Sequence, residues 1–126
     1  MRVDDQITFI YVSDLEQAAR FYGNVIGLEQ VLDQGGCLIF RVTPTSFLGA
    51  CTLRPEQVGV AGALVTFVTE DVDIWYQRLV EDGATILTEP AHNETFKIYN
   101  FFAEDPDGNR FEVQRFDDPT WKVADA

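Results

Sequence analysis

An internal repeat limits the folds open to this 126-residue chain more than any other feature. The stretch that begins at Ile7, ITFIYVSDLEQAARFYGNVIG, matches in pattern the stretch that begins at Leu64, LVTFVTEDVDIWYQRLVEDG. The offset of 57 residues between Ile7 and Leu64 also carries Asp14 onto Asp71. Self-similarity that spans a strand and a helix together indicates two copies of one supersecondary unit.

Each copy begins with an apolar run rich in β-branched and aromatic residues, which predicts a strand. A helix is expected next. In the first copy, SDLE offers Ser13 as the N-cap and Glu16 three residues later, the pair of a capping box. Gly27 and Gly83 stand where the two helices should end, because glycine tolerates the left-handed conformation there.

Three short runs with strand composition follow each predicted helix. They are LEQVL, CLIFRV and FLGACTL in the first copy, and ATILTE, FKIYNFF and RFEVQRF in the second. Gly35-Gly36 and the DPDGN of residues 105–109 fit tight turns. We therefore predict a single α+β domain in which two tandem βαβββ modules form curved mixed sheets around a cavity. Module one covers about residues 5–54, the linker 55–62, module two 63–116 and a tail 117–126.

Charge and hydropathy exclude several classes of protein. The net charge of -12 argues against nucleic acid as a partner, because phosphate binding needs clustered basic residues. No apolar run is long enough to span a membrane, and the N-terminus lacks the features of a signal peptide, so we expect a cytoplasmic protein. Cys37 and Cys51 lie in apolar runs, which favours reduced core thiols over a disulfide.

Two stretches, YVSDLEQAARFYGNVIGL and DPDGNRFEV, resemble the vicinal oxygen chelate superfamily, which includes glyoxalase I, extradiol dioxygenases and the fosfomycin- and bleomycin-resistance proteins. The resemblance covers about residues 5–116. It implies the tandem βαβββ fold and a homodimer. It does not specify the reaction, because one fold hosts many chemistries.

Metal-using members of that superfamily place His or Glu ligands on four matched strands, and the resemblance transfers these positions to this chain. Glu112 falls on the last-strand position, whereas Ile7 and Leu64 fall on the first-strand positions of the two modules. The fourth position falls on Cys51, or on Glu56 if short gaps shift it. Because Ile7 and Leu64 have no lone pair to offer, we predict no metal cofactor.

Glu112 has three interpretations. The alternation of Arg110, Glu112 and Gln114 places it opposite Phe111 and Val113, which would pack against a helix. It is then a hydrogen-bonded or solvated carboxylate, an anchor for a cationic or hydrogen-bonding ligand group, or a general base.

Alternation along the other strands extends the candidate ligand-binding surface. Ile7, Phe9 and Tyr11 share one face of the first strand. In the run FKIYNFF, Tyr99 and Phe101 share one face and Phe102 lies on the other, and alternation does not decide which of these faces looks inward. The candidate ligand-binding residues are Ile7, Phe9, Tyr11, Cys51, Leu64, Thr66, Tyr99, Phe101, Glu112 and Gln114.

These observations predict a metal-independent protein that binds a small organic molecule, nearest in type to the bleomycin-resistance members. The ligand would be aromatic or cationic, held in an apolar cavity, and sequestered for resistance without catalysis. The alternative is a metal-dependent lyase, isomerase or dioxygenase that uses Glu112. Its divalent metal would need Glu112, Glu56 and His92, the only histidine, to converge.

Overall fold

The computed structural model describes residues 1–121 and divides into two compact units. Unit 1 contains Met1–Gly62 and also the short segment Asp105–Asn109. Unit 2 contains Ala63–Glu104 and the chain from Arg110 onward. The sequence repeat does not predict that residues 105–109, which lie in the second copy, belong to unit 1.

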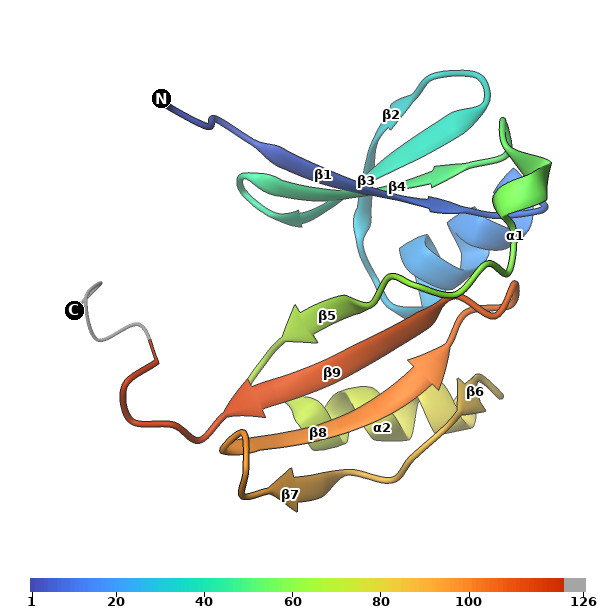
Figure 1. The fold of residues 1–126 in the computed structure, drawn as a ribbon. Coiled ribbons are helices and arrows are strands. Elements are labelled where there is room, and N and C mark those ends of the chain that lie inside the picture. Colours follow the sequence, from blue (N-terminus) through green and yellow to red (C-terminus); the bar gives the residue numbers. More distant parts are fainter. Residues whose placement is uncertain (122–126) are drawn as a thin grey trace. The chain divides into compact units, whose positions relative to one another are not determined.

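Unit 1 has one four-stranded mixed sheet with the order β1-β4-β3-β2 (Figure 1). The strands β1 and β4 are parallel, and the other neighbours are antiparallel. The short helix α1 continues directly into a π-helical turn, η1. The elements are β1 (Gln6–Tyr11), α1 (Leu15–Ala18), η1 (Ala19–Val25), β2 (Glu29–Asp33), β3 (Cys37–Thr43), β4 (Ser46–Cys51) and the 3₁₀ turn η2 (Pro55–Gln57).

Unit 2 repeats this plan with the sheet order β5-β9-β8-β6, and β5 is parallel to β9. Its helix α2 lies along one face of the sheet (Figure 1). A short additional strand, β7, pairs with β8, and the sequence analysis predicts no strand at this place. The elements are β5 (Val65–Val68), α2 (Val72–Glu81), β6 (Thr85–Ile86), β7 (Ala91–Asn93), β8 (Ile98–Glu104) and β9 (Arg110–Phe116). The α+β fold of two mixed sheets is therefore confirmed.

Each sheet buries the face that its helix covers. In unit 1, Phe40 is fully buried and its ring lies 6.1 Å from that of Tyr22 in η1. In unit 2, Phe101 is fully buried and meets Tyr76 of α2 edge-on at 5.3 Å. Burial of each such side chain stabilises the fold by about 1.5–3 kcal/mol. The opposite, helix-free faces carry most of the predicted ligand-binding residues.

The N-cap of α1 differs from the prediction. Asp14, and not Ser13, is the cap, and its carboxylate accepts a hydrogen bond from the backbone N–H of Gln17 at 3.1 Å. Ser13 instead donates its backbone N–H and its hydroxyl to the Asp107 carboxylate, at 3.0 and 2.7 Å. Among residues 1–121, no helix combines the length and the hydropathy needed to cross a membrane.

The segment Asp105–Asn109 closes unit 1 around a buried carboxylate. Asp105 is 3% exposed and accepts hydrogen bonds from the Tyr22 hydroxyl at 2.8 Å, from the backbone N–H groups of Asp107 and Asn109, and from the Asn109 amide. The same Asn109 amide donates to the carbonyl oxygen of Tyr11 at 3.0 Å. Burial, followed by the charge of Asp105, raises the pKa of Tyr22 well above its ordinary value.

The prediction that Cys37 and Cys51 are reduced thiols is wrong for this structure. They form a disulfide between β3 and β4, where the antiparallel register places them directly opposite each other with a Cα–Cα distance of 4.1 Å. The two cysteines are 14 positions apart in the sequence, so their proximity depends on the register of the hairpin, which spacing alone does not reveal.

Candidate functional site

A buried carboxylate lies at the centre of the helix-free face of unit 2. Glu112 is 7% exposed and lies between Phe111 and Val113, which face the helix-covered side. This placement confirms the alternation predicted for the last strand. Its register partners are Thr66 on β5 and Phe102 on β8, so three strands converge on this carboxylate.

Three neutral side chains hold the Glu112 carboxylate. The Thr66 hydroxyl donates to Oε1 at 2.9 Å, and the Asn100 amide donates to Oε2 at 2.7 Å. In the amide orientation that satisfies both side chains, Gln114 donates to Oε2 at 2.9 Å and to Oε1 at 3.3 Å. Within residues 1–121, none of the ion pairs includes Glu112. The carboxylate is thus well hydrogen-bonded but forms no ion pair with the basic side chains that the structure describes.

Asn100 is a site residue that the sequence analysis missed. It lies on β8 opposite Gln114, and its amide reaches across to Glu112. The signal was present in the run IYNFF, where a single amide interrupts apolar residues. A polar residue in the middle of a half-buried strand needs a partner, and the pairing of β8 with β9 supplies it.

Apolar side chains surround this polar centre on the same face. Phe102 is half-buried and lies directly opposite Glu112, and Val68 on β5 is 52% exposed. Leu64, immediately before β5, is 47% exposed. Further along β9, Phe116 stacks on Trp121 with ring centroids 3.9 Å apart. The face therefore combines a few polar groups with an apolar surround, the usual composition of a small-molecule site.

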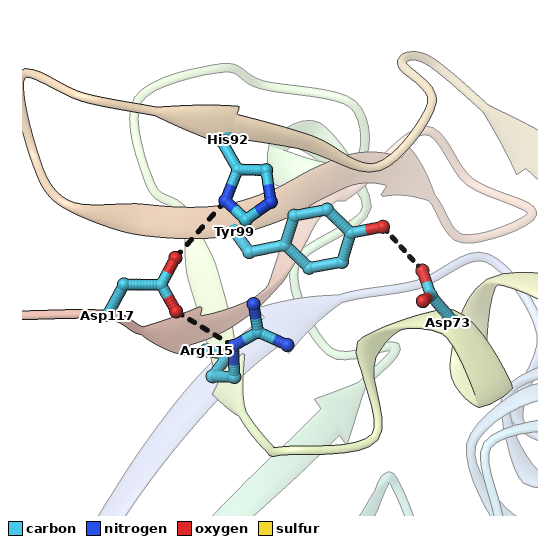
Figure 2. Close-up of polar contacts among 5 residues, drawn as sticks. All are labelled: Asp73, His92, Tyr99, Arg115 and Asp117. Atoms are coloured by element: carbon cyan, nitrogen blue, oxygen red, sulfur yellow. Dashed lines mark hydrogen bonds and ion pairs between the residues drawn. The ribbon is translucent and has the colours of Figure 1, made fainter.

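Tyr99 and Phe101 of β8 lie on the helix-covered face of the sheet, away from Glu112. The sequence does not decide which face of this strand they occupy, and the structure does. Phe101 packs in the core. Figure 2 shows the Tyr99 ring between His92 and Arg115, at 4.7 Å from the His92 ring centroid and 4.8 Å from the guanidinium carbon. The Tyr99 hydroxyl donates to Asp73 at 2.7 Å, and this hydrogen bond raises the pKa of Tyr99.

His92 belongs to this second cluster and not to the surroundings of Glu112. Its Nδ1 lies 3.2 Å from Oδ2 of Asp117, whose other oxygen accepts from Arg115 at 2.9 Å (Figure 2). The Arg115 hydrogen bond lowers the pKa of the Asp117 carboxyl. Because His92 contacts Tyr99 on the helix-covered face, the sheet separates its imidazole from Glu112.

Unit 1 presents a largely apolar helix-free face. Ile7 and Phe9 are 44% and 45% exposed and share this face with Tyr11, as the alternation predicts. Phe9 lies over Gly49 on β4, where a Cβ atom would overlap its ring. The Cys51 end of the disulfide lies beside Tyr11 in the register, and Glu56 is exposed in η2. Cys51 thus contributes a disulfide sulfur and not a thiol.

A divalent metal, which the fold family implies for its enzyme members, does not fit these residues. Both oxygens of Glu112 already accept hydrogen bonds from neutral donors, and Leu64 offers no donor atom. His92 lies across the sheet from Glu112. In the part of the chain that the structure describes, no three His, Cys, Asp or Glu side chains gather in a group able to hold an ion. A divalent ion needs several such ligands together.

Comparison with known proteins agrees with this fold. The chain belongs to the Glyoxalase/Bleomycin resistance protein/Dioxygenase superfamily, whose family model matches residues 5–113. A search of curated proteins finds no match.

Solved structures of the same superfamily resemble the chain. A lactoylglutathione lyase from Agrobacterium tumefaciens is 25% identical with a TM-score of 0.69, and the match covers 87% of this chain and 91% of that one. A glyoxalase/bleomycin resistance protein from a Streptomyces species is 26% identical with a TM-score of 0.71, over 86% and 97% of the two chains. A glyoxalase/bleomycin resistance protein/dioxygenase from Nocardioides, at 20% identity and a TM-score of 0.73 over 92% and 85%, shows the fold alone.

Proposed function

We propose that this protein is a metal-independent small-molecule binding protein that holds an aromatic or cationic organic compound and confers resistance by sequestration. The observation that carries this proposal is the state of Glu112. Its two oxygens are satisfied by Thr66, Asn100 and Gln114, so the carboxylate is organised for hydrogen bonding and not for metal coordination.

The exposed apolar side chains of each unit support a ligand that is organic and in part flat. The helix-free face of unit 1 exposes Ile7 and Phe9, and that of unit 2 exposes Val68 beside the half-buried Phe102. Exposed apolar side chains that form a contiguous patch on a protein surface mark binding sites for ligands or partners. Neither face carries the clustered basic residues that a phosphate would need.

The alternative is a metal-dependent lyase, isomerase or dioxygenase of the same superfamily. The similarity to a lactoylglutathione lyase at 25% identity favours it. Such an enzyme would need Glu112 to exchange its neutral donors for further ligands. The position of His92 across the sheet argues against this arrangement.

Metal analysis of the purified protein tests the proposal. We expect zinc, nickel, manganese and iron to be present well below one ion per chain, before and after dialysis against each metal. Ile7→His provides a matched variant, because one added imidazole beside the unchanged Leu64 still leaves too few ligands. Stoichiometric metal in the unmodified protein, or tight zinc uptake by Ile7→His, would contradict the proposal.

A further inference from the structure

We propose that the helix-free face of unit 2 is a subsite for organic cations, in which Glu112 recognises a protonated amine attached to an apolar body. This inference rests on the proposed function and names the ligand class of one of its surfaces. It follows from the charge, the hydrogen bonds and the neighbours of Glu112.

The first step is the charge of the carboxylate. Thr66, Asn100 and Gln114 all supply hydrogens to it, and a group that only accepts is an ionised carboxylate. Neutral donors stabilise this anion without cancelling its charge. Glu112 is 7% exposed and takes part in none of the ion pairs among residues 1–121. A buried charge without a counter-ion is costly, and a cationic ligand would relieve that cost.

The second step is the number of acceptor positions that a ligand could use. A carboxylate has about four lone-pair positions, and four contacts reach them, of which the contact from Gln114 to Oε1 at 3.3 Å is the longest. An ammonium group that replaces this longest contact needs one acceptor position, whereas a metal ion demands several ligands together. Thr66 is exposed and Asn100 half-buried, so a ligand can approach the carboxylate from their side.

The third step is the body of the ligand. Phe102 lies opposite Glu112 on the neighbouring strand and the same face, where cross-strand side chains are about 4.5–5.5 Å apart at Cβ. An ammonium group at Glu112 therefore lies within reach of the Phe102 ring, which attracts cations through its π-face. Val68, 52% exposed on β5, offers apolar surface for the rest of the molecule.

The net charge of -12 works in the same direction. An acidic protein concentrates cations near its surface and repels anions, so the subsite should reject carboxylates as well as prefer amines. This attraction should weaken as salt is added, because exposed charges are screened.

Three probes of the same shape test the inference: 2-phenylethylammonium, 2-phenylethanol and phenylacetate, titrated into the ¹⁵N-labelled protein and followed by NMR. We expect the ammonium probe to bind about 10- to 100-fold more tightly than the alcohol, since hydrogen bonds to charged groups are the stronger class. Phenylacetate should bind more weakly than either. The shifted amides should include those of Glu112 and its neighbours on β5, β8 and β9.

Glu112→Gln should remove the preference for the ammonium probe over the alcohol. Glu81→Gln is the matched control, because it deletes the same charge from the exposed end of α2. Phe102→Leu keeps an apolar side chain and should weaken ammonium binding several-fold, which preserves a test if the Glu112 variant fails to fold.

The outcomes separate the two proposals. Equal affinity for the ammonium and alcohol probes, or an equal loss in Glu112→Gln and Glu81→Gln, would overturn the cation subsite while leaving an organic-binding function intact. Failure of all three probes to shift any amide on this face would overturn the subsite. Stoichiometric bound metal would overturn the proposed function itself.

Discussion

The disulfide between Cys37 and Cys51 allows the structure of unit 1 to be tested by measuring the stability of the protein before and after reduction. The two cysteines are 14 positions apart in the sequence, and closing a loop of about this size stabilises a fold by about 3 kcal/mol in the chain-entropy description. With an unfolding entropy of about 2.1 cal/mol/K per residue for 126 residues, that free energy corresponds to about 11 °C in melting temperature. Reduction of the disulfide should therefore be visible in both chemical and thermal unfolding.

The assay is urea unfolding of the oxidised protein with and without a phosphine reductant, with intact mass recorded under denaturing conditions. We expect the reductant to lower the free energy of unfolding by about 3 kcal/mol. The double variant Cys37→Ala with Cys51→Ala should start from the lower value and show no response to reductant. An unchanged urea midpoint in protein whose mass proves reduction would refute the reasoning.

The cytoplasmic location stays a prediction. The disulfide bears on it, because disulfides persist mainly in oxidising compartments.

Three further substitutions test the packing of the two units. Tyr22→Phe removes the hydrogen bond to the buried Asp105 and should cost about 1.5–3 kcal/mol. Because the pKa of Tyr22 is raised in the folded state, its contribution to the free energy of unfolding is complete below pH 10 and is lost as the pH rises towards the folded pKa. Between pH 8 and 11, the free energy of unfolding should therefore fall less steeply with pH in the variant than in the unmodified protein. Phe101→Ala should cost about 3–5 kcal/mol in urea unfolding because its ring is fully buried against α2, and a loss below 1 kcal/mol would contradict that placement. Gly49→Ala should displace the ring of Phe9 and cost about 1–3 kcal/mol, and a crystal structure with Phe9 unmoved would disprove the contact.

Local patterns predicted the parts of the fold that depend on local interactions. The last strand was predicted at its observed bounds, Arg110–Phe116, because a tight turn precedes it and apolar residues alternate along it. The first helix begins near its predicted position, but Ser13 is taken by Asp107, which is 94 residues away in the chain. A competing partner at that distance leaves no local trace, so the sequence favoured the wrong cap.

In the candidate site too, local patterns predicted some residues, whereas others depend on tertiary structure. Alternation placed Glu112 and Gln114 on one face, and the internal repeat placed Thr66 in the same set as Ile7, Phe9 and Tyr11. Asn100 was missed because its face depends on how β8 pairs with β9, and that register is a tertiary property. The disulfide was missed for the same reason, since the β3–β4 register decides that Cys37 faces Cys51.

The inclusion of Asp105–Asn109 in unit 1 has a consequence for how the chain can be divided. A fragment that stopped at Gly62 would retain Tyr22 and Ser13 but lose Asp105 and Asp107, which accept hydrogen bonds from their hydroxyl groups. Each orphaned donor would disfavour the native arrangement of that fragment. When the two halves are expressed separately, unit 1 should thus recover its native structure only after mixing, because residues 105–109 come with the second half.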